Sequence, residues 1–591
     1  MKKIINQPET AVVEMCKGMV LAHPELEFVS KYKIIKKKVL NADKVSLISG
    51  GGSGHEPAHA GYVGKGMLDA AVCGDIFASP SQIQVYQAIR ATAGNKGTLL
   101  IIKNYSGDMM NFKNAAFLAG EDGIEVDYVR VDDDISVKDS LYTVGRRGVA
   151  GTVLVHKIAG AAAEEGRSLA EVKAAAEKAA SQVRSIGFAL TSCTVPAKGT
   201  PTFEIAEGEM EYGVGIHGEP GISREPAARA DQLAARMVEA LLADLGIRSG
   251  EGGGEPAEIA VLINGFGGTP LLELYLFNNA VTRELAARGN ITICKTFVGN
   301  YMTSIDMAGA SVTFMKLDEE LKTLLFRESD TPAFKVSGPD DIVPYAEVAE
   351  DETARADVSY ETETPESYAE IKDDKLTVEN IVYLLDKMSE IIIKNEVPFC
   401  ELDAHAGDGD FGMSIAKGFR QLKREWKELL AHSAGDIGTF LNACSLVIME
   451  HCGGASGPIW GSAFRSAGRA AGDKTAVTVP EFAEMMQAAV AGIQSVGERS
   501  FGRGAVVGDK TLIDALVPCA DSWEESGRTG DDFKTAFAKG AAAAANGAKK
   551  TEAIAARMGR AGAVGDRSIG YPDAGAYALG VIFTELSAQV K

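Results

Sequence analysis

Several signatures are absent from this sequence, and each absence argues against a class of protein. The eight cysteines include no C-x-x-C pair, which argues against a zinc or disulfide framework and favours reduced thiols in a cytoplasmic protein. No apolar run reaches about 18 residues and the amino terminus soon turns polar, so neither a membrane span nor a signal peptide is predicted. The pattern G-x-x-x-x-G-K-[ST] is also missing, so an ordinary P-loop is not expected to bind a nucleotide.

The chain also lacks an excess of basic residues. It contains 60 Lys and Arg against 81 Asp and Glu, with a formal net charge of -21. Nucleic acids and anionic membranes bind basic surfaces, so neither is expected as a partner. The 591 residues are enough for several domains, and an apolar content of 46% is ordinary for a globular protein.

Acidic residues are concentrated in one stretch of the chain. Residues 340–374 contain thirteen Asp or Glu but only two basic residues. A charge block of this kind, with prolines in and beside it, favours an extended linker. We therefore expect a domain at 1–335, an acidic linker at 336–374 and a second domain at 375–591.

The two halves carry different secondary-structure patterns. In the first half β-rich runs alternate with helix-like segments, including one near Pro226–Leu245, which predicts an α/β domain in two subdomains. The predicted strands are Lys44–Ser49, Asp69–Cys73, Thr98–Lys103, Glu125–Val131, Gly151–Val155, Glu258–Asn264, Thr292–Val298 and Ser311–Lys316. Beyond the linker, the apolar spacing from Ile381 to Ile392 and the Ala-rich stretches near Ala536–Arg557 and Ala574–Ser587 predict an all-helical domain.

Three carboxylates lie close together in the second half. Asp403, Asp408 and Asp410 fall within eight residues that contain no Lys or Arg. Like charges at this spacing disfavour one another's ionisation unless a cation compensates them. Oxygen ligands on a Gly-containing loop suit Mg²⁺, whose shell is completed by phosphate and water oxygens, so the cluster points to phosphoryl transfer. A solvated acidic turn is the alternative for this loop considered alone.

Three well-known loop motifs fit this segment poorly. Residues 407–412 spell G-x-G-x-x-G, but the Asp side chains inside it would repel a pyrophosphate and no strand-like run precedes it. An EF-hand that began at Asp408 would need Glu where Phe419 stands. The Asp-Phe-Gly at 410–412 lacks the H-R-D-type loop that accompanies it in protein kinases.

Polar residues follow Gly-rich or strand-like segments of the first half. His55 ends the segment Ser49-Gly-Gly-Gly-Ser-Gly-His, where glycines let backbone N–H groups approach a ligand. Lys103 ends the predicted strand Thr98–Lys103 and Asp108 follows it, and His217 lies between glycines. An isolated histidine is more often structural, so each of these elements alone predicts little.

Taken together, these segments resemble the dihydroxyacetone kinase family, and the resemblance covers nearly the whole chain outside the linker. In the first half the matching motifs are S-G-G-G-S-G-H-E-P at 49–57, C-G-D-I-F-A-S-P at 73–80, K-N-Y-S-G-D at 103–108 and G-I-H-G-E-P-G at 215–221. In the second half they are D-x4-D-x-D at 403–410, G-G-A-S-G-P at 453–458, G-D-K-T at 508–511 and G-R-A-G-A-V-G-D-R-S-I-G at 559–570.

Carried over by position, the resemblance assigns the ketose site to the first half. It implies that His217 attacks the ketone carbon and holds the substrate as a hemiaminal, that Asp108 is the base toward the terminal hydroxyl, and that His55 assists by hydrogen bonding. A histidine nucleophile must be neutral, which an ordinary imidazole pKa allows at cytoplasmic pH. The remaining substrate contacts implied are Gly51, Gly52, Ser53, Gly54 and Lys103.

The resemblance likewise assigns the nucleotide site to the second half, which would be an antiparallel eight-helix barrel. It implies that Asp403, Asp408 and Asp410 hold two Mg²⁺ ions that bridge the phosphates of ATP. Ser456 would donate to a phosphate from its helix start. The implied nucleotide contacts are Phe411, Gly412, Met413, Ser414, Ala455, Ser456, Leu512, Arg560, Asp573, Ala574 and Gly575. Of these, Phe411, Ala455 and Leu512 differ from the residues that relatives often carry.

The function implied is the ATP-dependent phosphorylation of dihydroxyacetone to dihydroxyacetone phosphate, with glyceraldehyde as a second substrate and a homodimer as the expected assembly. Three alternatives remain. A kinase for a related ketose such as erythrulose would use the same motifs, a lyase that cyclises the ribityl–ADP part of FAD would need the metal but not His217, and a regulatory protein would sense the triose through His217. The intact acid cluster argues against a pure sensor. A phosphoenolpyruvate-driven kinase is disfavoured because both domains are fused in one chain.

Overall fold

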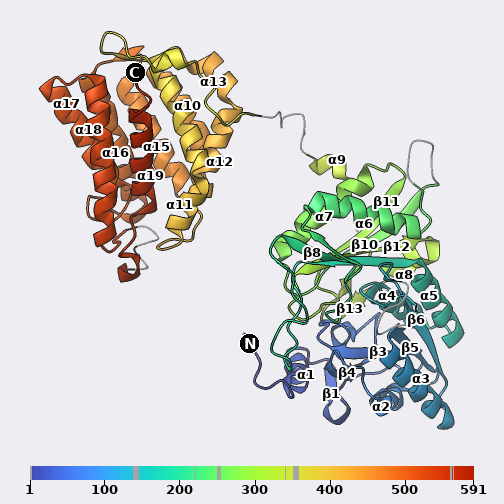
Figure 1. Ribbon diagram of the computed structural model, residues 1–591. Helices are drawn as coiled ribbons and strands as arrows, with labels where there is room; N and C mark the ends of the chain where they lie inside the picture. Colours follow the sequence, from blue (N-terminus) through green and yellow to red (C-terminus); the bar gives the residue numbers. More distant parts are fainter. Residues whose placement is uncertain are drawn as a thin grey trace. The chain divides into compact units, whose positions relative to one another are not determined.

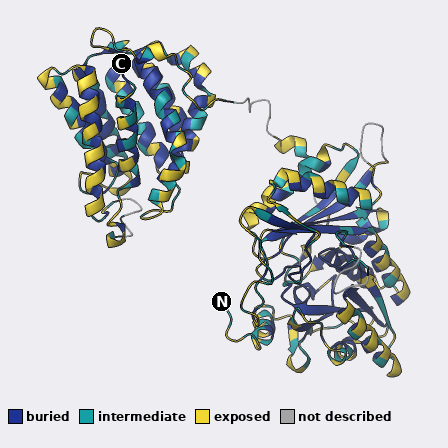
Figure 2. Cartoon of the chain, in the orientation of Figure 1, coloured by how far each residue is buried: buried dark blue, intermediate teal, exposed yellow. Residues whose placement is uncertain are grey.

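The computed structural model describes residues 3–137, 145–219, 221–248, 255–339, 341–349, 358–558, 562 and 565–591. The chain divides into two compact units, Met1–Glu350 (unit 1) and Asp351–Lys591 (unit 2), and each is described by itself (Figure 1). Buried residues line the interior of each unit and exposed residues its outside (Figure 2). Among the described residues, no helix is both long enough and apolar enough to cross a membrane.

The first sheet of unit 1 has the strand order β1-β2-β4-β3-β5-β6. Strands β4, β3, β5 and β6 run parallel, and β1 and β2 are antiparallel at one edge. The strands are β1 (Leu26–Val29), β2 (Ile34–Lys37), β3 (Ser46–Ser53), β4 (Ala70–Ile76), β5 (Thr98–Lys103) and β6 (Val126–Val131). The helices that contact these strands are α1 (Ala11–Ala22), α2 (Gln82–Thr92), α3 (Ser106–Glu121), α4 (Thr152–Glu164) and α5 (Leu169–Gln182). Ligands of such sheets bind beyond the carboxyl ends of the strands, where the loops after β3 and β5 begin.

The second sheet of unit 1 has the order β11-β10-β12-β7-β8-β9, in which only β10 and β11 are parallel neighbours. Its strands are β7 (Val183–Ala189), β8 (Glu209–Tyr212), β9 (Ser223–Pro226), β10 (Ala257–Gly265), β11 (Ile291–Gly299) and β12 (Gly309–Leu317). The helices are α4 (Thr152–Glu164), α5 (Leu169–Gln182), α6 (Ala230–Asp244), α7 (Leu271–Ala286), α8 (Glu319–Phe326) and α9 (Tyr345–Val348), and a short hairpin joins β13 (Ser329–Asp330) to β14 (Lys335–Val336). The expected α/β architecture in two subdomains is confirmed, and α5 contacts strands of both sheets.

One predicted strand is wrong. Residues Thr152–Val155 of the expected strand Gly151–Val155 form the first turn of α4. Every residue of this helix from Thr152 to Ala163 is buried. A helix with no exposed face loses the amphipathic spacing that identifies surface helices, so its β-branched residues resemble a buried strand in sequence. The strands β1, β2, β7, β8 and β9 were not predicted from any sequence pattern.

Unit 2 is all-helical, as expected. Among the described residues of unit 2, the eight longest helices form a closed ring in which each packs on the next and α19 packs on α10. In ring order they are α10 (Val378–Lys394), α12 (Phe411–Arg424), α14 (Ile437–His451), α15 (Ser456–Ala471), α16 (Val479–Phe501), α17 (Ile513–Thr529), α18 (Phe533–Lys550) and α19 (Ala574–Ser587). The shorter elements are α11 (Glu396–Asp403), α13 (Trp426–Ser433), β15 (Leu376–Thr377) and β16 (Ala476–Val477). Apolar side chains of the ring helices pack in its interior and line an apolar cavity there, among them Leu385, Trp460, Phe482 and Leu579.

The second part of the expected linker, residues 358–374, is not an extended, solvated chain, because it is hydrogen-bonded to a helix of unit 2. We call this segment the strap. The amide of Glu363 and the amide and hydroxyl of Thr364 donate to Asp386 Oδ2, at 3.0, 2.9 and 2.6 Å. Asp386 is fully buried and pairs with Lys423. The acidic side chains of the strap stay largely exposed while its backbone satisfies a buried carboxylate, which is why composition alone suggests a solvated linker.

Candidate active sites

At Gly52, near the end of β3, and at Gly54, just after it, the chain lies too close to Phe77 and Ala78 for a side chain. A Cβ on Gly52 would lie 2.7 Å from the backbone nitrogen of Ala78. Gly54 has a φ of +101°, and a Cβ there would lie 2.9 Å from Phe77 Cε1. Ser53 donates its hydroxyl to the Gly74 carbonyl at 2.8 Å. These positions shape a tight loop that ends at His55.

His55 and His217, 162 residues apart in the sequence, face each other. Their Nε2 atoms are 3.1 Å apart and their rings are 4.6 Å apart, edge to face. His55 Nδ1 lies 2.8 Å from the Thr303 carbonyl, which can only accept, so this nitrogen carries the proton of the neutral ring. The fold therefore brings together the two histidines that the sequence singled out.

Both imidazoles are held neutral by their surroundings. Burial lowers the pKa of His55 well below the ordinary histidine value, and the charge of Lys103 lowers it further. Burial also lowers the pKa of His217, with smaller contributions from His55, Lys103 and Arg147. A neutral ring keeps a nitrogen lone pair, which a nucleophile needs.

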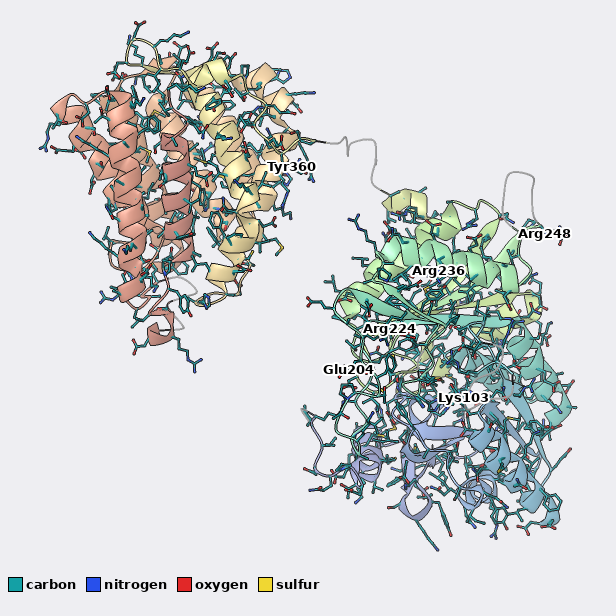
Figure 3. All side chains as sticks on the ribbon, viewed as in Figure 1. Lys103, Glu204, Arg224, Arg236, Arg248 and Tyr360 are labelled. Carbon is teal, nitrogen blue, oxygen red and sulfur yellow. The ribbon has the colours of Figure 1, made fainter. Side chains whose placement is uncertain are left out.

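Lys103 and Asp108 meet at Gly51. A Cβ on Gly51 would lie 3.2 Å from Lys103 Nζ and 3.5 Å from Asp108 Oδ2, so both polar groups converge on this glycine. Lys103 (labelled in Figure 3) is fully buried, and burial lowers its pKa against the opposing effect of Asp108. Burial raises the pKa of Asp108, while Lys103 and Ser79 oppose the rise.

Tyr105 connects these two pairs. Its ring lies 4.4 Å from the His217 ring, and Lys103 Nζ lies 5.4 Å from its centroid. Phe77 adds a further wall, 5.1 Å from the His55 ring and 5.3 Å from the His217 ring. Sequence reasoning missed both aromatic residues as parts of the site, although each lies within one of the family motifs; Thr303 lies in none of them.

In unit 2 the acid cluster forms at the junction of α11 and α12. Asp403, Asp408 and Asp410 each offer an oxygen, and the three oxygens lie within 4.8 Å of one another. Asp403 Oδ2 accepts the Gly409 amide at 2.9 Å, and a Cβ on Gly407 would lie 2.3 Å from Asp403 Oδ1. Burial raises the pKa of Asp403, and Asp408 and Asp410 add to the rise. This set of hard oxygen donors fits a divalent cation.

One cleft of unit 2 is lined by Asp403 of this cluster, and Asp408 and Asp410 are not among its lining residues. Its volume is about 900 Å³ including the open mouth. It brings together residues from α11, the starts of α12, α15 and α19, and the segments before α12, α15, α17 and α19. The predicted site residues that line it are Asp403, Phe411, Ala455, Ser456, Leu512, Asp573, Ala574 and Gly575.

Three other predicted nucleotide contacts lie beside the cleft, on the first turn of α12. Gly412 is covered by the Glu396 carbonyl, and a Cβ there would lie 2.0 Å from that oxygen. Met413 is 56% exposed. Ser414 donates its hydroxyl to the Gly453 carbonyl at 2.7 Å. The remaining predicted nucleotide contact, Arg560, falls outside the described residues.

Two cleft residues hold its rim in place. Lys510, which sequence reasoning missed although it lies in the G-D-K-T motif, donates to the carbonyls of Ile554, Ser568 and Tyr571 at 3.1, 2.5 and 2.8 Å. Asp573 caps α19 by accepting the Ala576 amide at 2.8 Å. Burial raises the pKa of Asp573 to about 7.

Comparison with known proteins places this arrangement in a family. Residues 17–333 match the Dak1 domain and residues 405–588 match the DAK2 domain. The crystal structure of the dihydroxyacetone kinase of C. freundii covers 99% of this chain and 99% of its own, with 33% identity and a TM-score of 0.57. The chain belongs to the dihydroxyacetone kinase family. It is therefore a kinase, in agreement with the sequence prediction.

Curated relatives within the dihydroxyacetone kinase family differ in their substrates. The D-erythrulose kinase of Mycolicibacterium smegmatis is 35% identical over 98% of this chain and 97% of its own. The triokinase/FMN cyclase of Rattus norvegicus is 34% identical, with the same coverage of both chains. The dihydroxyacetone-binding subunit DhaK of a PTS-dependent kinase from Listeria innocua is 50% identical over 54% of this chain and 95% of its own. The C. freundii kinase has also been solved with AMP-PNP and Mg²⁺.

Proposed function

We propose that this family member phosphorylates dihydroxyacetone with ATP and accepts glyceraldehyde as a second substrate. The observation that carries the proposal is the pair of neutral histidines, the buried His55 and the partly buried His217, with Nε2 atoms 3.1 Å apart. A ketone carbon is an electrophile, and a desolvated neutral imidazole is a suitable nucleophile for it. The family's sugar-kinase activity agrees with this chemistry.

The covalent step involves one C–N bond. A ring nitrogen of His217 attacks the ketone carbon, the C=O π bond breaks, and the ring N–H proton ends on the ketose oxygen. The product is a hemiaminal with no co-reactant required. Glycerol has no carbonyl group and forms no such bond, so His217 selects ketoses and aldehydes against polyols.

We assign Asp108 and Lys103 to the substrate hydroxyl that accepts the phosphoryl group. Burial raises the pKa of the Asp108 carboxyl, which makes it a better base toward a terminal hydroxyl than an exposed aspartate. Lys103 opposes the rise, so the carboxylate form remains available. Gly51 has no Cβ to separate these groups from a small substrate.

The cleft of unit 2 is assigned to magnesium and ATP. Asp403, Asp408 and Asp410 would hold two Mg²⁺ ions, because three carboxylate oxygens within 4.8 Å need cationic compensation. Bound magnesium supplies neutralisation of phosphate charge. Ser456 lies in the cleft at the start of α15, where the backbone N–H groups of a helix favour a phosphate.

A kinase for erythrulose is the second candidate, since relatives of that activity align over the full chain. An assay of purified protein with dihydroxyacetone, both glyceraldehydes, erythrulose and glycerol separates the two. We expect the highest kcat/KM with dihydroxyacetone and none with glycerol. A tenfold preference for erythrulose overturns the substrate, and phosphorylation of glycerol overturns the covalent selection.

The phosphoryl donor, an FAD-cyclising activity and the oligomeric state are tested with the same purified protein. ATP is expected to serve without carrier proteins, whereas a requirement for phosphoenolpyruvate and carriers would match the subunit-type relatives of unit 1. FAD is offered in the same assay to detect a cyclising activity of unit 2. We also propose a cytoplasmic homodimer, and sedimentation of the purified protein tests the dimer.

A further inference from the structure

His217 lies in a loop whose two ends are tied to one side chain. The loop joins β8 to β9, and the part that carries His217 runs from Gly213 to Glu219. Arg147 comes from the segment before α4 and is only 1% exposed. Its Nη2 donates to the Gly213 carbonyl at 2.9 Å, and its Nη1 donates to Glu219 Oε1 at 3.1 Å.

Glu219 links Arg147 to the backbone of His217. Its second oxygen, Oε2, accepts the backbone N–H of His217 at 2.8 Å. The carboxylate folds over Gly215, where a Cβ would lie 1.8 Å from Glu219 Oε1 and 2.7 Å from Arg147 Nη1. No other residue type fits at Gly215 while these two groups stay in place.

Arg147 is itself fixed from a different segment. Its Nε donates to Asp134 Oδ2 at 2.7 Å, and Asp134, which follows β6, is also buried. The amide of Asp134 in turn donates to the Arg147 carbonyl at 3.0 Å. One guanidinium therefore bridges three acceptors, which an arginine fork allows and a lysine ammonium does not reproduce in the same geometry.

We propose that Arg147 is a positioning residue for covalent ketose capture, which it serves by fixing the Gly213–Glu219 loop so that the His217 ring meets the ketone carbon. The inference rests on the proposed function of His217 and extends it to a residue that does not touch the substrate. Rigid placement of a nucleophile supplies a large share of its reactivity, and a displacement of about 1 Å costs about 100-fold. The positive charge of Arg147 also helps to keep the His217 ring neutral, in addition to burial.

The test compares Arg147→Lys and Arg147→Gln with Arg146→Gln in the full-length chain. Arg146 is a matched control, because its guanidinium pairs in partly exposed surroundings with Asp244 of α6. Addition of dihydroxyacetone labelled with ¹³C at the ketone carbon reports the hemiaminal directly, since the carbonyl resonance is replaced by one from a tetrahedral carbon. Calorimetry gives the ketose and Mg-ATP dissociation constants.

We expect both Arg147 variants to lose most of the tetrahedral signal and to bind the ketose about 100-fold more weakly, with Mg-ATP affinity unchanged. Arg146→Gln should match the wild type in all three measurements. A folded Arg147 variant that retains the wild-type signal overturns the positioning role alone. A wild type that shows no tetrahedral carbon overturns the covalent step and the positioning role together.

Removal of Arg147 leaves the buried carboxylates of Asp134 and Glu219 without their cation, so these variants risk unfolding. Glu219→Gln is then the deciding variant, because it keeps the size of the side chain and leaves Arg147 paired with Asp134. Weakened ketose binding with a normal melting curve supports the proposal. Unchanged ketose binding in Glu219→Gln overturns it.

Discussion

Four histidines of unit 1 lie in two close pairs, in which His55, His59 and His156 are buried and His217 is partly buried, and this has consequences for stability. Besides His55 and His217, His59 Nδ1 lies 3.0 Å from His156 Nε2. Burial lowers the pKa of His59 well below the ordinary value and that of His156 to about 3. All four are therefore neutral in the folded chain at neutral pH.

We predict that unit 1 loses stability as the pH falls below about 6.5. There the unfolded chain binds a proton on each of these histidines while the folded chain does not, so each contributes a loss of about 1.4 kcal/mol per pH unit. Thermal unfolding between pH 7.5 and 5.5 measures the loss, and the transition that shifts on ketose binding identifies unit 1. His156→Asn should show a shallower slope, and a flat profile in the wild type would contradict the prediction.

A second residue-level prediction concerns the nucleophile. His217→Ala should weaken ketose binding strongly and leave Mg-ATP binding unchanged, because the C–N bond is lost while unit 2 is untouched. The loss of kcat is expected to be smaller than the loss of affinity, since the rest of the pocket still orients the substrate. His432→Ala, at an exposed site of α13, is the control. Equal ketose affinity in both variants would refute the role of His217.

At the scale of elements, the loop between α11 and α12 is predicted to depend on magnesium for its charge balance. Asp403→Ala, Asp408→Ala and Asp410→Ala should each abolish Mg-dependent ATP turnover, a loss of several kcal/mol, while ketose binding persists. Without metal, Asp408→Ala and Asp410→Ala should be as stable as the wild type or more so, because one repelling charge is gone, whereas Asp403→Ala also loses the acceptor of the Gly409 amide. Added Mg²⁺ should raise the Tm of the wild type more than that of any of the three variants.

Glu484→Gln, which removes an exposed carboxylate from α16, controls for the loss of charge alone. It should keep both turnover and the response of Tm to magnesium. Near-normal turnover in any two of the three Asp variants would show that the cluster is not the metal site.

The strap is the second element with a measurable role. Thr364→Val removes the hydroxyl that donates to Asp386 Oδ2 at 2.6 Å and should destabilise unit 2 by about 1.5–3 kcal/mol, the range for hydrogen bonds to charged groups. Denaturant unfolding measures the difference. Ser367→Ala, at an exposed position of the strap, should be within about 0.5 kcal/mol of the wild type.

For the whole molecule, the division into two units predicts separable activities. Residues 1–349 should fold and bind the ketose, residues 358–591 should fold and bind Mg-ATP, and neither alone should make product. A mixture should regain activity that rises with concentration, because a tether supplies only effective concentration. A piece that begins at 375 lacks the strap, leaves Asp386 short of three donors, and should melt at a lower temperature than 358–591. Full activity of 358–591 with dihydroxyacetone would refute the two-site model.

Local patterns were sufficient for much of this chain. The strand at Thr98–Lys103 and the helix at Ala574–Ser587 were predicted with the bounds that the structure has, because their apolar runs end at clear polar or glycine positions. The strand predicted at Gly151–Val155 failed because burial on all sides removes periodicity. The strap was predicted as an extended linker because composition does not show that a buried Asp386 needs its amides.

By itself the sequence determined the α/β and helical halves, the acid cluster and the family, because these depend on spacing along the chain or on contiguous motifs. Asp403 to Asp410 span eight residues, so one loop brings the three carboxylates together. Only the tertiary structure decided that His55 faces His217, that Arg147 bonds to the loop that carries His217, and that α4 is buried from Thr152 to Ala163. These arrangements join segments far apart in sequence, and their geometry arises only when the sheets pack and remove the groups from water.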